Sequence, residues 1–240
     1  SSDVCSSDLA KLRQLRTDLA PLASIEIPTV TSADLMQIVD RKARSAPISA
    51  NRLLAAIKTL STWASSRGHL QANIAATLRK PARETPRDRV LSLSEVAVIW
   101  RATEQLGSVW EAIYKLLILT AQRREEVASM RWDEIDLQRA EWLIPAGRTK
   151  NRQPHIVPLS PAAMAVLRAA QDGKGPSVYM FSTTGRTPIS GFSKSKARLD
   201  ELSGVTNWRI HDLRRTAVTH MAEAGVDPWV RSEEHTSELQ

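Results

Sequence analysis

The residues of this chain that could perform chemistry together are basic, and one pair of them lies near residue 212. His211 and Arg214 are three positions apart, so in a helix both side chains project from one face. If Asp212 opens that helix, the pair lies at its N-terminus, where free backbone N–H groups favour an anion. A guanidinium beside an imidazole would then form a site for phosphate. The alternative is an ordinary helix start with solvated arginines, and the motif alone does not decide between them.

A second basic position follows an apolar segment. Arg123 comes directly after residues 109–121, where solubility gives no reason for two consecutive arginines. Glu126, three positions on, can hold a guanidinium in a fixed pose through a carboxylate pair. The alternative is an ion pair on a helix surface, which contributes little to stability.

A further cation, Lys150, lies in a turn between two apolar runs, residues 142–145 and 155–158, which predict an antiparallel hairpin. Its flexible stem could reach into a groove, although most hairpin lysines only keep the turn soluble. Two arginines, a lysine and a histidine suit phosphate, because phosphoryl transfer chiefly needs positioning and neutralised charge. The sequence shows no Walker glycine loop, paired carboxylates or metal-ligand cluster. We therefore expect neither a metal nor a cofactor.

The composition favours a polyanionic partner. The 240 residues carry a formal charge of +7 and a pI near 9.9, which points to nucleic acid before membrane because no basic amphipathic anchor is evident. No apolar run approaches the length of a membrane span, which favours a soluble globular protein. The single cysteine, Cys5, excludes an internal disulfide and fits a reducing compartment. We expect a cytoplasmic protein.

The two ends differ from the rest of the chain. Residues 1–9 hold the only cysteine among serines and aspartates, and residues 231–240 are polar and acidic. Both resemble translated sequencing-library adapter, so we interpret them as non-native and exclude them from the fold. Each segment carries a net charge of −2, so the remaining chain carries +11. Residues 10–230 are therefore more basic than the chain as a whole.

Apolar periodicity predicts a mainly α fold with a small antiparallel sheet, of the α+β class. Residues 10–80 form a helical domain, 81–91 a linker with two prolines, and 92–230 a second domain that opens with a capping box. The first domain has a helix capped by Thr31 or Ser32, one at 47–67 and a short one at 72–79. The helix at 47–67 has an apolar stripe of Leu53, Leu54, Ile57, Leu60 and Trp63. In the second domain, helices are expected at 109–121, 160–170, 190–202 and 212–225.

Several other cations are candidates for contact with DNA, although a solvated face explains each equally well. They are Arg52 and Lys58 in the first domain, Arg148 and Arg152 in the hairpin turn, and Lys194 and Lys196 on the basic helix at 190–202.

The basic motifs carry a family resemblance. The segment LTAQRREEV at 119–127 resembles the first arginine box of the tyrosine recombinases, or phage integrases, with Ala121 where glycine is usual. The segments TKN at 149–151 and VPLS at 157–160 resemble the family's lysine hairpin, and HDLRR at 211–215 resembles its second box. All three occur in the family's order, after a helical N-terminal domain. The chain is most similar to prophage or genomic-island integrases.

The resemblance implies a reaction and a set of roles. A tyrosine would attack a DNA phosphodiester, giving a 3′-phosphotyrosyl link and a free 5′-hydroxyl, without metal or nucleotide. Arg123 and Arg214 would bind the non-bridging oxygens, and Lys150 would be the general acid for the leaving oxygen. His211 would assist proton transfer, and Glu126 would orient an arginine. It also implies double-stranded DNA as partner, a core DNA-binding role for residues 10–80, a homo-tetramer on paired sites for the complete protein, and a bacterial or phage origin.

The nucleophile is where the sequence departs from the family. Its only tyrosines, Tyr114 and Tyr179, lie upstream of the second box in apolar contexts that suit packing. The family's tyrosine follows the helix at 212–225, so we expect a truncated, inactive recombinase whose catalytic domain is incomplete. The alternatives are a DNA-binding remnant or accessory factor without covalent chemistry, and a type IB topoisomerase-like enzyme. The separate helical domain and small size disfavour the topoisomerase.

Overall fold

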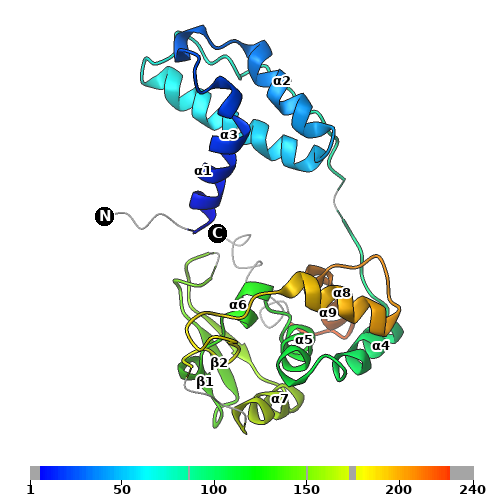
Figure 1. Ribbon diagram of the computed structural model, residues 1–240. Coiled ribbons are helices and arrows are strands. Elements are labelled where there is room, and N and C mark those ends of the chain that lie inside the picture. Colours follow the sequence, from blue (N-terminus) through cyan, green and yellow to red (C-terminus); the bar gives the residue numbers. More distant parts are fainter. Residues whose placement is uncertain (1–5, 86, 150, 173–176, 228–240) are drawn as a thin grey trace. The chain divides into compact units, whose positions relative to one another are not determined.

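The computed structural model describes residues 6–85, 87–149, 151–172 and 177–227 (Figure 1). The chain divides into two compact units, Ser1–Arg87 and Asp88–Gln240. The first unit contains α1 (Ser6–Asp18), η1 (Ala20–Leu22), η2 (Ile27–Thr29), α2 (Ser32–Ala43) and α3 (Pro47–Ser66). The second contains α4 (Leu93–Thr103), α5 (Ser108–Thr120), α6 (Arg124–Ala128), η3 (Trp132–Glu134), β1 (Ile135–Asp136), β2 (Glu141–Ile144), β3 (His155–Pro158), α7 (Pro161–Asp172), α8 (Phe192–Ser203) and α9 (Ile210–Glu223). The predicted α+β class is confirmed.

The first unit is a helical assembly built on α2 and α3. Thr31 is the N-cap of α2, as predicted, and exchanges capping hydrogen bonds with Asp34. The core between the two helices is formed by Leu35, Ile38, Val39, Leu53, Leu54 and Ile57. At the end of the predicted α3 stripe, Leu60 is 43% exposed and Trp63 51% exposed. Both line an open apolar pocket of about 630 Å³ that α1 also borders.

The short helix predicted at residues 72–79 is not formed; turns occupy this segment. Asn73 explains the difference, because its side-chain oxygen accepts from the backbone N–H of Ala75 at 3.1 Å and its amide donates to Thr62 at 2.9 Å. Such side-chain bonds to nearby backbone compete with helix formation. The segment is therefore fixed as a turn against α3.

The second unit contains the small sheet. Its strands are antiparallel in the order β1-β2-β3, with Trp142 opposite Val157 and Ile144 opposite His155. The predicted hairpin is confirmed as β2 and β3. Strand β1 was not predicted, because two residues are too few to show an alternating pattern. Among the described residues, no helix has both the length and the apolar composition needed to cross a bilayer.

Helix α5 is the centre of the second unit, and it packs against α4, α7 and α9 (Figure 1). Ile113, Tyr114 and Leu116 are completely buried, which confirms the buried helix predicted at 109–121. The Tyr114 hydroxyl lies 3.3 Å from Ser195 Oγ, and burial raises the pKa of Tyr114 to about 12. Tyr114 is therefore a core residue, as its apolar context indicated.

The segment that leads into the second unit is bound to α9 through the backbone N–H and carbonyl groups of Leu91. Its N–H donates to Thr216 Oγ1 at 2.9 Å, and its carbonyl oxygen lies 3.0 Å from His220 Nε2. The other ring nitrogen of His220 lies 2.8 Å from Glu223 Oε2. Because both partners are acceptors, the Leu91 carbonyl first and then Glu223 raise the pKa of His220. The imidazole of His220 thus links α9 to the start of this unit.

This link predicts a pH-dependent stability. Because the folded-state pKa of His220 lies above the unfolded value of about 6.5, its contribution is complete below that pH and is lost as the pH rises through the folded-state pKa. We expect His220→Gln to lower the free energy of unfolding by about 1 kcal/mol at pH 5.5 and by less at pH 8. Chemical denaturation across this range measures the difference, with His69→Gln as control. An equal loss at both pH values would contradict the prediction.

Candidate active site

Arg123 is held by Glu126, three residues further along the chain. It is the N-cap residue of α6, and its backbone N–H donates to Glu126 Oε2 at 2.8 Å. Its guanidinium donates through Nη1 to Glu126 Oε1 at 2.9 Å. The predicted i+3 pair is present, although the carboxylate divides its oxygens between backbone and side chain. Since Glu126 is only 3% exposed, its charge is shielded from solvent and fixes the arginine firmly.

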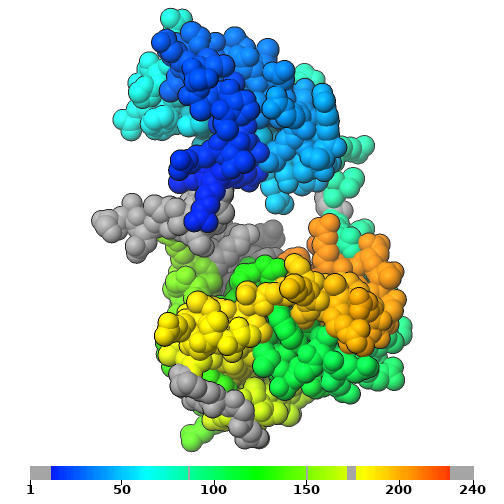
Figure 2. Space-filling view, in the orientation of Figure 1, coloured from blue at the N-terminus to red at the C-terminus, as the bar shows by residue number. Residues whose placement is uncertain are grey.

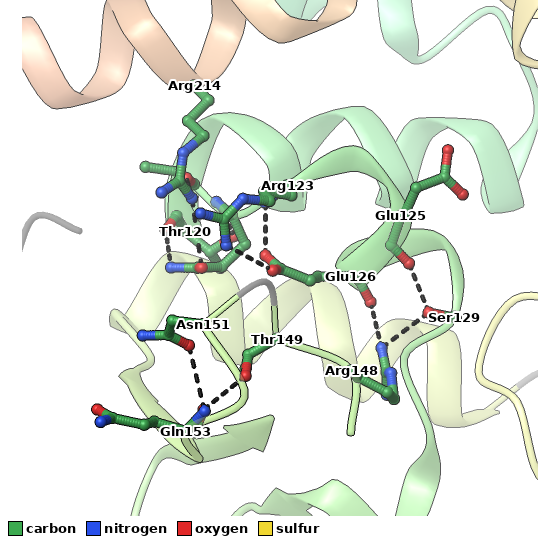
Figure 3. A network of polar contacts seen from close by, with 12 residues as sticks. Thr120, Arg123, Glu125, Glu126, Ser129, Arg148, Thr149, Asn151, Gln153 and Arg214 are labelled. Carbon is green, nitrogen blue, oxygen red and sulfur yellow. Dashed lines mark hydrogen bonds and ion pairs between the residues drawn. The ribbon is translucent and has the colours of Figure 1, made fainter. Parts of the chain in front are cut away.

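Arg214 reaches the same region from α9. Its Nη1 donates to the carbonyl oxygen of Ala121 at 2.6 Å and lies 3.5 Å from Gln122 Oε1. Ala121 ends α5 in the left-handed conformation, with φ 54° and ψ 21°, and this turn aims its carbonyl at Arg214. Figure 3 draws Arg123 and Arg214 in one network of polar contacts, and Gln122, whose Oε1 lies 3.5 Å from Arg214, directly precedes Arg123 in the chain. Residues more than ninety positions apart in the sequence are thus brought together.

His211 lies at the exposed side of the same helix start. Helix α9 begins at Ile210, so the prediction that Asp212 opens it was wrong by two residues. Asp212 instead occupies the third helical position and accepts from the backbone N–H of Arg209 at 2.9 Å. His211 is exposed, whereas Arg214 is 6% exposed and buried. The pair therefore offers one buried guanidinium and one accessible imidazole.

A pocket of about 670 Å³ lies between these elements. In Figure 2, the green surface of α6 borders the yellow surface at the start of α8, which forms one side of it. Its lining contains five Arg and Lys side chains and two carboxylates, so the wall is basic. The lining residues are Arg123, Arg124, Glu125, Glu126, Arg148, Thr149, Phe192, Ser193, Lys196, Trp208, Arg209, Ile210 and His211.

Aromatic rings hold two cations of this wall. The ammonium of Lys196 lies 3.8 Å from the ring centre of Trp208 and binds both carboxylate oxygens of Asp200, at 2.5 and 2.6 Å. The guanidinium of Arg124 lies 5.2 Å from the ring centre of Phe192. The predicted DNA contact Lys196 thus faces the pocket. Lys194, two residues earlier, is exposed.

The loop between β2 and β3 borders the pocket through Thr149. Lys150 lies outside the described residues. The Thr149 hydroxyl lies 3.1 Å from the Ala146 carbonyl oxygen and 2.7 Å from that of Gln153, which closes the loop on itself (Figure 3). Arg152 is exposed, with a left-handed φ of 57°.

Arg148 lines the pocket and also binds partners inside the second unit, and its contact with DNA stays a prediction. It forms an ion pair with Glu134 and donates through Nη2 to the Glu126 carbonyl at 2.7 Å and to Ser129 Oγ at 2.9 Å (Figure 3). An arginine in a basic turn gives no indication of such partners, because they come from α6 and η3. Arg148 thus connects the loop between β2 and β3 to α6 and η3.

The remaining cations named from sequence belong to the first unit. Arg52 is exposed on α3, and Lys58 donates to the Ala76 carbonyl at 3.1 Å. Sequence reasoning missed Arg124, Arg209 and Glu134. Arg124 and Arg209 each stand beside or near a motif residue, so proximity to the motifs was the available signal. Glu134 had none.

The fold is that of solved integrases. The structure resembles a lambda integrase (75–356) dimer bound to a COC′ core site with a TM-score of 0.78 and 16% identity, over 99% of this chain and 92% of that one. It resembles a lambda integrase tetramer bound to a Holliday junction with a TM-score of 0.76 and 17% identity, over 99% of this chain and 75% of that one. At such identities the likeness shows the fold alone.

Family membership comes from the sequence matches. The model of the phage integrase family matches residues 89–230. Prophage integrase IntZ of Escherichia coli K12 is 31% identical over 218 residues, covering 88% of this chain and 54% of IntZ. The tyrosine recombinase XerC of Corynebacterium glutamicum is 27% identical over 237 residues, covering 91% and 74%. The chain belongs to the phage integrase family, and it spans about half the length of the prophage integrases it matches.

The left-handed turn at Ala121 yields a prediction. Alanine at this φ is strained where glycine is not, so Ala121→Gly should raise the free energy of unfolding by about 1 kcal/mol. Ala112→Gly, inside α5, is the control and should lower it by about 1 kcal/mol or more. Urea denaturation of the three proteins measures both shifts. Destabilisation by Ala121→Gly would mean that the turn is not strained.

Proposed function

We propose that this chain is the DNA-binding and catalytic part of a site-specific recombinase that cleaves and rejoins DNA through a 3′-phosphotyrosyl intermediate. One observation carries the proposal. Arg123, which lines the basic pocket, is held by buried Glu126, and Arg214 is held by the carbonyl of Ala121, two residues before Arg123 in the chain. Membership of the phage integrase family supports the same reading.

The two arginines would neutralise the non-bridging oxygens of the scissile phosphate. Glu126 and the Ala121 carbonyl already fix their guanidinium groups, so little reorganisation is needed when charge develops on those oxygens. His211, exposed at the pocket rim, would bind the phosphate and assist proton transfer. Lys150 would protonate the leaving 5′-oxygen, since it follows Thr149 of the pocket wall.

In the covalent step, a tyrosine oxygen forms a bond to phosphorus while the bond to the 5′-oxygen breaks, and that oxygen takes a proton from the acid. A 5′-hydroxyl of another strand then reverses the step, which releases the tyrosine. Tyr114 is completely buried, with a pKa raised to about 12 by burial, and Tyr179 pairs with Arg131 in a β-bridge. Neither lines the pocket. The nucleophile would therefore be a tyrosine other than these two.

The partner we propose is double-stranded DNA. The pocket wall is basic, and exposed Lys194 and Arg152 in the second unit and Arg52 in the first are candidates for backbone contacts. Two structures with this fold are described as a dimer on a core site and a tetramer on a Holliday junction. A tetramer on paired sites, in the bacterial cytoplasm, is our proposal for the complete protein. A DNA-binding factor without covalent chemistry is the alternative, favoured by the positions of both tyrosines.

The 240-residue chain itself tests the binding half of the proposal. We expect it to bind duplex DNA with an affinity that falls as salt rises. The logarithm of the binding constant should fall linearly with the logarithm of the salt concentration, with a slope of about −0.9 per phosphate contacted. We expect no covalent adduct with a nicked suicide duplex, because neither tyrosine reaches the pocket. Fluorescence anisotropy and denaturing gels measure the two results. An adduct mapped to Tyr114 or Tyr179 would overturn the assignment of the nucleophile.

The catalytic half is tested in a chain that continues into a tyrosine-bearing segment. There, Arg214→Ala should reduce formation of the covalent DNA adduct about a hundredfold to a thousandfold, since it removes a preorganised donor. Duplex affinity should change little, because many other cations contact the backbone. Arg139→Ala, an exposed arginine paired with Glu141 on the sheet, is the matched control. Unchanged cleavage by Arg214→Ala would remove Arg214 from the site.

A further inference from the structure

Helix α8 forms a fixed base beside the pocket. Its Leu199 is completely buried in the core of the second unit, and the hydroxyl of its Ser195 lies 3.3 Å from that of buried Tyr114 on α5. The helix also packs against α4. Lys196 therefore extends from a backbone that is held on two sides, and its side chain is only 15% exposed.

The turn between α8 and α9 leads into the pocket wall, to which residues 208–211 all contribute. Two hydrogen bonds shape this turn. The indole N–H of Trp208 donates to the Val205 carbonyl at 3.1 Å, and the backbone N–H of Arg209 donates to Asp212 at 2.9 Å. Both bonds are local, so neither joins the turn to α8.

Lys196 joins the turn to α8. Its ammonium lies 3.8 Å from the centre of the Trp208 ring and donates to both carboxylate oxygens of Asp200, one helical turn further along, at 2.5 and 2.6 Å. A cation over a tryptophan face is attracted by the ring, more strongly where water is excluded. Trp208 is 5% exposed and belongs to the core. Asp200 thus holds the cation, and the cation holds the ring.

We propose that Lys196 is a positioning residue that clamps Trp208 and so sets the place of His211 in the pocket wall. This inference rests on the proposed function, in which His211 binds the scissile phosphate. Trp208 is followed directly by Arg209, the N-cap of α9, and His211 projects from the first turn of that helix. A displaced ring would therefore shift the helix start that carries the imidazole.

Direct contact with DNA, which the sequence predicts for Lys196, makes a different demand on the ammonium. It has three N–H donors, and two carboxylate oxygens and a ring face already surround it. A phosphate would have to displace Asp200. Such a contact would add one phosphate to the salt dependence of DNA binding, whereas a clamp adds none.

The test compares Lys196→Met, which removes the charge, with Lys196→Arg, which keeps a cation that can stack on the ring. In the free 240-residue chain, Lys196→Met should quicken amide exchange of residues 208–211 about fivefold to thirtyfold, the factor that a shielded cation–π contact supplies. In the unmodified chain, duplex DNA should protect His211 from carbethoxylation, read by mass spectrometry. Lys196→Met should lose this protection and Lys196→Arg should keep it, with the salt slope of binding unchanged in both.

Arg198→Gln is the matched control. Arg198 lies two residues beyond Lys196 on the same helix, and its side chain is 60% exposed and paired with Glu201. The substitution removes the same charge from an exposed position. Amide exchange of residues 208–211 and the protection of His211 should both stay as in the unmodified chain.

Other outcomes would overturn the proposal. Protection of His211 that survives in Lys196→Met would refute the clamp, and a salt slope about 0.9 shallower in that variant would show a direct phosphate contact. Faster amide exchange throughout the second unit would show a general structural role. If the unmodified chain binds no DNA, or binds it without protecting His211, the proposed role of His211 fails. Amide exchange then still decides the clamp, and unchanged exchange of residues 208–211 in Lys196→Met would refute it.

Discussion

The site depends on one hydrogen bond, from the buried guanidinium of Arg214 to the carbonyl oxygen of Ala121. It joins the end of α5, which packs against α4, α7 and α9 in the second unit, to α9. The carbonyl faces Arg214 only because the chain leaves α5 through a left-handed residue, and the same turn starts the segment that carries Arg123. A single local conformation therefore determines where both arginines lie.

Carboxylates organise this basic site. Glu126 fixes Arg123 and Glu134 fixes Arg148 from buried positions, whereas Asp200, whose side chain is 36% exposed, fixes Lys196. Asp212, 1% exposed, caps α9 and pairs with Arg215. Without these partners, mutual repulsion and the flexibility of long side chains would spread the cations apart. The carboxylates thus reduce local charge but make the cations rigid, which suits stabilisation of a developing charge.

Sequence reasoning succeeded where the deciding interactions are local. The Arg123–Glu126 pair, the Thr31 and Ser92 caps and the buried α5 all follow from residues within a few positions of one another. The predictions for the start of α9 and for residues 72–79 were wrong, because each depends on a capping or side-chain partner that periodicity does not reveal.

The internal partners of Arg148 could not be predicted for the same reason. Its partners lie 14 to 22 residues upstream and become neighbours only when the hairpin folds onto α6.

Helix α6 shows why the site requires the whole second unit. Five residues are too few to form a helix in isolation, since nucleation is costly and tertiary packing must supply the stability. Val127 and Ala128 provide that packing in the core around α5. Glu126, between them and Arg123, offers its carboxylate to Arg123 and its carbonyl to Arg148. The geometry of Arg123 and of Arg148 is thus set by one short helix that only the folded core can maintain.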